Sequence, residues 1–189
     1  MLIARQKKQE NIAEYLLYMW QVEDLIRACQ LDEQRIEGLL VSRFASIPDV
    51  NLAEIRQWYL ELRDMMLQEG KREKAHLQIN DNILIDLTDL HQHLLRQGQD
   101  AIYTSCYYST LPYIVELRSK QSCADGEDKR LGELETCFTA LYGLMLLHMQ
   151  HQTVGEQTQV AMKQISKFLG LLSMKYKEWK SGELKFSDQ

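Results

Sequence analysis

The chain has 189 residues, of which 9 are Gly and 2 are Pro. With 45% hydrophobic and 26% charged residues, this composition excludes a disordered, collagen-like or Pro-rich chain and predicts one domain with a full hydrophobic core. The formal net charge of −5 provides no basic surface for phosphates, so we expect no nucleic-acid partner.

Cysteine spacing and the first residues predict a cytoplasmic protein. The four cysteines lie far apart with no C-x-x-C pair, as expected of free thiols in a reducing compartment. Arg5, Lys7 and Lys8 follow Met1 too closely for the apolar core of a secretion signal. The longest apolar stretch, residues 141–149, is much shorter than the roughly 18 residues of a membrane span, so we expect no membrane partner.

The first half of the chain shows apolar residues at helical spacing. Residues 12–29 predict a long helix with one apolar arc, formed by Ile12, Tyr15, Leu16, Met19, Trp20, Val22 and Ile26. Asp32 is expected to cap a second helix that buries Ile36, Leu39, Leu40 and Phe44. Asn51, with Glu54 at the capping-box spacing, predicts the start of a third helix.

Four further helices complete the prediction. The fourth covers residues 72–97, and Gly70 either separates it from the third or weakens one longer helix. The fifth begins near Asp100 and contains Pro112; we expect a kinked continuous helix, although Thr110 is also a suitable cap for a restart. The sixth, residues 128–150, is apolar on nearly all sides toward its end, which is typical of a helix surrounded by others. The seventh covers residues 156–180.

These elements predict an all-α fold. We expect a single-domain bundle of six or seven helices over residues 1–180, with the first and sixth helices near its centre. Residues 181–189 are expected to form a frayed C-terminal tail.

Glu23 is the most conspicuous polar residue on an apolar face. It lies between Met19 and Ile26 on the predicted first helix, and Arg27 follows four residues later, which favours an ion pair. A half-buried structural pair is the expected role, because an unpaired buried charge is costly. A ligand-binding role for Glu23 and Arg27 is the alternative.

Two more groups are candidate ligand-binding residues. In the predicted fourth helix, His76, Asn80 and His91 share one face with apolar residues, where core hydrogen bonding is the simpler interpretation. In the fifth helix, Tyr107 and Tyr103 lie on one face near Pro112, where phenol groups either pack at the edge of the core or line a small pocket.

The sequence indicates no catalytic motif, cofactor or metal site. Glu73 and His76 match one E-x-x-H element of di-iron bundles, but such sites need a second element, and none occurs. Phosphate-binding glycine loops and the G-x-S-x-G nucleophile motif are also missing. We therefore lean toward a protein without enzymatic activity.

Several segments resemble a bacterial family of small helical proteins that is defined only as a domain of unknown function. The similarity covers nearly the whole chain and is carried by residues 1–7, 10–28, 74–80, 111–118, 133–143 and 164–173. The resemblance implies a bacterial, single-domain, helical protein. It implies no activity, cofactor or catalytic residue.

The function predicted from the residues is a non-enzymatic cytosolic interaction protein that forms a homodimer. The number of aromatic residues and methionines exceeds what one narrow apolar stripe per helix requires. The alternative is a small-molecule binding protein or enzyme whose polar pocket is lined by Glu23, Arg27, Asn80, His91 and Tyr107. An open cavity at these side chains would favour the alternative, and a closed hydrogen-bond network would favour the interaction protein.

Overall fold

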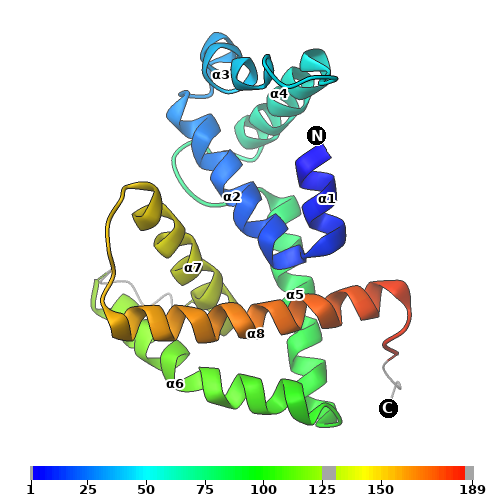
Figure 1. Cartoon of the computed structure of the whole chain (residues 1–189), viewed down its shortest axis with the longest axis vertical. Coiled ribbons are helices and arrows are strands. Elements are labelled where there is room, and N and C mark those ends of the chain that lie inside the picture. Colours follow the sequence, from blue (N-terminus) through cyan, green and yellow to red (C-terminus); the bar gives the residue numbers. More distant parts are fainter. Residues whose placement is uncertain (1, 125–130, 186–189) are drawn as a thin grey trace. The chain divides into compact units, whose positions relative to one another are not determined.

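The structure is a computed structural model that describes residues 2–124 and 131–185, with side chains described over 3–120 and 131–185 (Figure 1). These residues form eight α-helices and contain no strand, which confirms the all-α class. The elements are α1 (Leu2–Glu10), α2 (Ile12–Ala28), α3 (Glu33–Leu39), the 3-10 helix η1 (Val41–Phe44), α4 (Leu52–Gln68), α5 (Gln78–Gln97), α6 (Ala101–Ala124), α7 (Glu133–Met149) and α8 (Glu156–Ser181).

The chain divides into two compact units. The first contains Met1–Glu10 and Glu14–Ile83, and the second contains Asn11–Ala13 and Leu84–Gln189. The boundary falls inside α5, so this helix contributes its first residues to one unit and its remainder to the other. The single domain expected over residues 1–180 stays a prediction.

Local signals in the first unit correctly predicted where helices begin. Every apolar residue expected on the inner arc of α2 is buried. Oδ1 of Asp32 accepts a hydrogen bond from the backbone N–H of Arg35 at 2.9 Å, and Oδ1 of Asn51 accepts one from that of Ala53 at 3.1 Å. Both residues therefore cap their helices as predicted.

Two details of the first unit differ from the predictions. Helix α1 was not predicted, because no apolar stripe marks it. Ala4 has the only buried side chain among those described in this helix. Leu39 was expected in the core but is 55% exposed. Leu39 is the last residue of α3 and lies beside the buried face that Ile36 occupies, and the next residues, Leu40 and Val41, are buried instead.

The predicted start of the fourth helix at residue 72 is wrong. Gly70 has a φ of +70° and closes α4, with the N–H of Lys71 donating to the carbonyl of Met66 at 2.8 Å. Helix α5 begins only at Gln78. Residues 71–76 therefore form a loop, and His76 lies in this loop instead of on a helix face.

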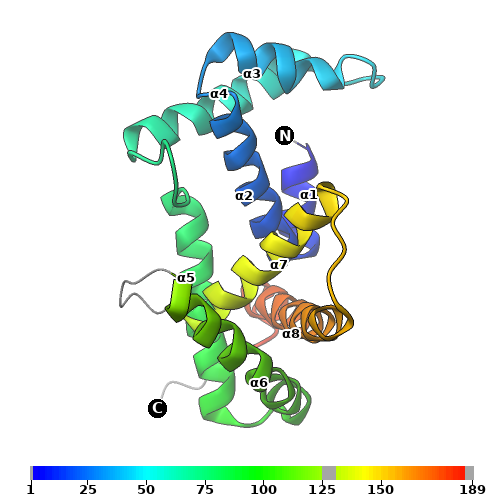
Figure 2. The ribbon, with the colours of Figure 1, turned by 90° about the vertical axis from the view of Figure 1, so that its left-hand side faces the viewer.

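In the second unit, α6, α7 and α8 pack on one another (Figure 2). Helix α6 runs without interruption through Pro112, so the predicted continuous helix is confirmed and a restart at Thr110 is not observed. Trp179 and Gly182 close α8, and Gly182 adopts the left-handed conformation with a φ of +80°. Residues 186–189 of the predicted tail lie outside the described part of the chain.

The central position predicted for the sixth helix is wrong for its C-terminal half. Residues 134 and 136–138 are buried, but 141–147 are only half-buried and Met149 is 54% exposed. In Figures 1 and 2 the C-terminal end of α7 projects away from α8. Residues 128–130 of the predicted helix lie outside the described residues.

Candidate functional site

The carboxylate of Glu23 is the centre of a buried polar cluster in the first unit. Helix α2 places it on its inner face, where its exposed fraction is 0%. Oε1 accepts hydrogen bonds from the N–H of Leu77 at 3.0 Å and from Nδ2 of Asn80 at 2.6 Å. Oε2 lies 2.7 Å from Nδ1 of His76. Three groups of the loop and of the start of α5 thus converge on one carboxylate.

The imidazole of His76 contacts both this carboxylate and the indole of Trp20. Its ring is stacked on the indole of Trp20, with centroids 4.0 Å apart and planes 6° apart. Trp20 precedes Glu23 by three residues and therefore lies beside it on α2. The side chain of His76 is 29% exposed, so one edge of the ring reaches solvent while the other edge faces Glu23.

Arg27 approaches Glu23 but bonds mainly to the loop. Its Nη2 lies 3.8 Å from Oε2 of Glu23, which is an ion-pair distance without a hydrogen bond. The guanidinium donates to Asp24 at 2.6 Å and to the backbone carbonyls of Lys71 and Ala75. Ala75 has a φ of +70°, a conformation that a residue with a Cβ keeps only when its surroundings hold it. Arg27 and Glu23 therefore fix the path of the loop.

The contacts of this cluster support a structural role. Both oxygens of Glu23 already accept hydrogen bonds, and burial of the whole carboxylate keeps solvent away from it. The side-chain oxygen of Asn80 is buried and has no hydrogen-bond partner among the described residues. The E-x-x-H element Glu73–His76 does not form on a helix, and His76 already bonds to Glu23. No three His, Cys, Asp or Glu side chains of the described chain are placed to share a metal ion.

His91 and Tyr107 belong to a second polar cluster, in the second unit. Nδ1 of His91 lies 2.7 Å from the hydroxyl of Tyr103. The hydroxyl of Tyr107 donates to Oε2 of Glu133 at 2.9 Å, and Nε2 of His91 lies 4.0 Å from the same oxygen. The rings of His91 and Tyr107 meet edge to face, with centroids 4.9 Å apart.

Burial disfavours the charged forms of His91, Tyr103 and Tyr107 in this second cluster and so shifts the pKa of each. It lowers the pKa of His91, and the nearby Glu133 carboxylate opposes that shift only in part. It raises the pKa of the Tyr103 and Tyr107 phenols, and for Tyr107 the hydrogen bond to Glu133 adds to the effect. Burial also raises the pKa of the Cys137 thiol to about 12. None of these groups is activated as a nucleophile at neutral pH.

The six predicted site residues therefore fall into two clusters in two units. Glu23, Arg27, His76 and Asn80 come together in the first. His91 and Tyr107 come together in the second. Sequence reasoning missed Trp20 and Glu133 as members. Helical spacing from Glu23 indicates Trp20, but no local pattern places Glu133 beside Tyr107, 26 residues earlier.

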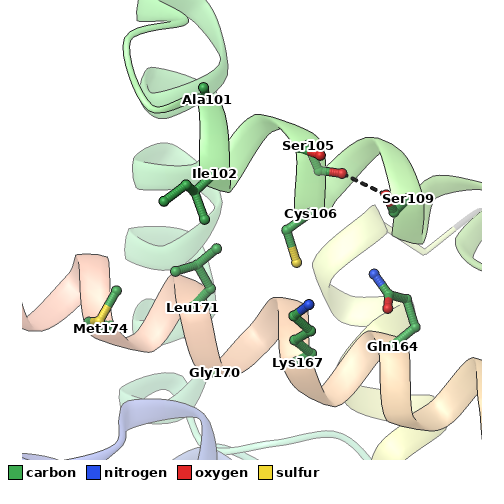
Figure 3. Close-up of a pocket in the computed structure, with 10 residues that line it drawn as sticks. All are labelled: Ala101, Ile102, Ser105, Cys106, Ser109, Gln164, Lys167, Gly170, Leu171 and Met174. Carbon is green, nitrogen blue, oxygen red and sulfur yellow. Dashed lines mark hydrogen bonds between the residues drawn. The ribbon is translucent and has the colours of Figure 1, made fainter.

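A groove between α6 and α8 is a third feature of interest (Figure 3). It has a volume of about 710 Å³. Its lining contains no acidic residue and consists of Ala101, Ile102, Ser105, Cys106, Ser109, Gln164, Lys167, Gly170, Leu171 and Met174. The sulfur of Cys106 points into the groove, and this thiol forms no disulfide.

Comparison with known proteins places the chain in a family. Residues 1–183 match the model of a domain of unknown function, DUF4924, so the chain belongs to that family. The resemblance stated from the sequence is thereby confirmed over nearly its whole length. No curated protein and no solved structure matches the chain. No helix of the described residues has the length and apolar character needed to cross a membrane.

Proposed function

We propose that this protein is a non-enzymatic interaction module that forms a symmetric homodimer through the C-terminal half of α7. The proposal rests on the apolar C-terminal end of α7, which the rest of the described chain covers only in part. Leu141, Leu144, Met145 and Leu147 are each half-buried, and Met149 is 54% exposed. Such contiguous apolar surface is typical of interaction sites.

The charge distribution favours a second copy of this chain as the partner. No Asp, Glu, Lys or Arg occurs between Thr136 and Gly155. Two copies with a net charge of −5 each repel one another over most of their surface. In a two-fold interface the same surface of both copies meets itself, so an uncharged surface avoids like-charge contacts.

Gly143 adds a geometric reason for helix pairing at this position. It lies in the middle of the apolar stretch, and a Cβ added there would meet nothing within 4 Å. A glycine at a helix crossing permits close approach of the two backbones. We expect an interface that buries at least about 1,000 Å² and includes Met or aromatic side chains.

The polar clusters support a role without catalysis. Glu23 is fully buried and bound by three donors, which supports an interaction protein over a pocket open to solvent at this carboxylate. A pocket formed by Glu23, Arg27, Asn80, His91 and Tyr107 would favour the alternative of a small-molecule binder or enzyme. Cys29, Cys106 and Cys137 are free and buried, which supports the proposed cytoplasmic location.

Sedimentation equilibrium of paired lysine variants tests the proposal. We expect Met145→Lys/Met149→Lys to be monomeric where the unmodified chain is dimeric, because both copies would bring added positive charges into the same apolar interface. Lysine near a helix C-terminus is favoured by the helix dipole, so the substitutions should not weaken α7 itself. They also make the net charge less negative, which reduces the general repulsion between two copies. The control Val115→Lys/Val160→Lys changes two apolar residues of the same unit that are 56% and 52% exposed, close to the 54% of Met149, and should stay dimeric.

If both variants keep the mass of the unmodified chain, α7 is not the interface. If both lose dimerisation equally, the effect is one of charge and not of this surface. Circular dichroism on both variants confirms that the helices are retained.

A further inference from the structure

We propose that the groove between α6 and α8 binds a single-chain amphiphile with an acidic head group, of the medium-chain fatty acid class. The inference concerns a site separate from the proposed dimer surface and does not depend on it. It rests on the segregation of apolar and polar side chains along the groove, on its charge and on a glycine in its wall.

One end of the groove is apolar and accessible. Ile102 on α6 is 76% exposed, and Met174 on α8 is 49% exposed. Leu171 lies between them on α8 and is half-buried, and Figure 3 shows all three at the same end. Exposed aliphatic side chains that meet across a groove offer a surface for a hydrocarbon chain.

The other end is polar and cationic. Ser105 and Ser109 on α6 and Gln164 and Lys167 on α8 lie there (Figure 3). Ser109 donates to the backbone carbonyl of Ser105, and Gln164 donates to Thr110 at 3.2 Å. Lys167 is exposed and forms no hydrogen bond or ion pair with the described residues, so its ammonium group is available to an anion. The lining has no carboxylate to compete for it.

The charge of the groove selects the head group. In a chain with a net charge of −5, this lining carries one positive side chain and no negative one. A carboxylate head meets the ammonium of Lys167 and the hydroxyls nearby, whereas a cationic head would be repelled. The groove therefore suits an acid at one end and an aliphatic chain at the other.

Gly170 leaves the wall of the groove open between its two ends. It lies inside α8, between Lys167 and Met174, where glycine weakens a helix by about 1 kcal/mol relative to alanine. The described residues place no steric or conformational demand for glycine there, because an added Cβ would meet nothing within 4 Å and Gly170 has no left-handed φ. The missing side chain keeps the two ends of the groove continuous.

The length of the groove sets the size of the ligand. Lys167 and Met174 are seven residues apart on one helix, which corresponds to about 10 Å along its axis. A medium-length acyl chain extends over that distance, while the head stays at Lys167. Decanoate is therefore a suitable probe.

Isothermal titration calorimetry with decanoate below its micelle-forming concentration tests the proposal. We expect saturable binding of one molecule per chain. Gly170→Leu should weaken binding at least tenfold by filling the groove, and it should not unfold α8, because leucine is the better helix former. Lys167→Met should weaken decanoate binding several-fold and leave the binding of the neutral analogue decanol unchanged.

Matched controls come from the same helix. Lys177→Met and Ser166→Leu change exposed residues of α8 that do not line the groove, and both should bind decanoate as the unmodified chain does. A second readout is Cys106, whose alkylation by iodoacetamide should slow when decanoate is bound. No saturable binding, or equal binding by Gly170→Leu and the unmodified chain, would overturn the proposal.

Discussion

Nδ1 of His76 lies 2.7 Å from Oε2 of Glu23, 53 residues earlier in the chain. This contact joins the middle of α2 to the loop that precedes α5. It explains why residues 71–76 are not helical although their composition permits a helix. A buried carboxylate on α2 needs donors, and the loop and first turn of α5 supply them.

The first prediction concerns Glu23 itself. Glu23→Ala should lower the free energy of unfolding by about 3 kcal/mol, because Asn80, His76 and the N–H of Leu77 lose a buried acceptor. The guanidinium of Arg27 is not stranded, since it keeps Asp24 and two backbone carbonyls. Urea denaturation measures the change.

A surface carboxylate on the same helix is the control for Glu23. Glu14 pairs with Lys7 at 2.9 Å and its side chain is 57% exposed. Glu14→Ala should change the free energy of unfolding by less than about 1 kcal/mol. Equal effects of the two substitutions would contradict the structural role of Glu23.

The second prediction concerns the loop held by Arg27. The backbone carbonyls of Lys71 and Ala75 in this loop accept hydrogen bonds from the guanidinium of Arg27. The loop also contains trypsin sites at Lys71, Arg72 and Lys74. Arg27→Met should therefore increase the rate of tryptic cleavage in this loop several-fold, because the loop opens more often. Mass spectrometry of the early fragments identifies the cleavage site.

For the loop experiment, Arg56→Met is a suitable comparison. Arg56 pairs with Glu33 and Glu37 on the surface of the same unit and does not touch the loop. This variant should be cleaved in the loop at the rate of the unmodified chain. Unchanged cleavage of Arg27→Met would show that the loop is held by other contacts.

These two predictions rest on contacts that lie beyond the reach of local sequence patterns. Asp32 and Asn51 were identified as caps because a cap depends on neighbours only two or three residues away. His76 was placed on a helix because its surroundings have helical composition. The groups that hold it in a loop, Glu23 and Arg27, are distant in sequence.

The same distinction applies to the second unit. The helix predicted over residues 156–180 is observed as α8, and its apolar residues Ile165, Phe168 and Leu172, which recur at helical spacing, are buried. The end of α7 was predicted to be surrounded because it is apolar on all sides. Composition alone does not distinguish an apolar helix end that its own chain covers from one that it leaves half-covered, and residues 141–147 are only half-buried.

The third prediction is a pH dependence caused by His91. Burial lowers the pKa of its imidazole below the unfolded value of 6.5, so the unfolded chain binds more protons between the two values. The free energy of unfolding should be highest above pH 6.5 and should fall as the pH decreases toward the pKa of the folded state. Denaturation at pH 7.5, 6.5 and 5.5 measures this slope.

His91→Asn isolates the contribution of this residue from those of the other histidines. The amide can still reach the hydroxyl of Tyr103 but does not titrate. The difference in unfolding free energy between the unmodified chain and this variant should shrink as the pH falls. A difference that is constant between pH 7.5 and 5.5 would contradict the assignment.

The fourth prediction concerns Pro112 in the middle of α6. The helix is continuous there, and proline has no N–H to donate to the carbonyl of Tyr108. Pro112→Ala restores that bond and should raise the free energy of unfolding by about 1 kcal/mol, after allowance for the greater freedom of the unfolded chain. Pro48→Ala, in the turn before α4, should not stabilise the chain. A loss of stability in Pro112→Ala would contradict the prediction.

The central claim is that the chain pairs with a second copy of itself, and the mass of the unmodified protein in solution tests it most directly. Light scattering coupled to size-exclusion chromatography at tens of micromolar should give twice the chain mass of 22.2 kDa. A mass of 22.2 kDa across that range would contradict the account.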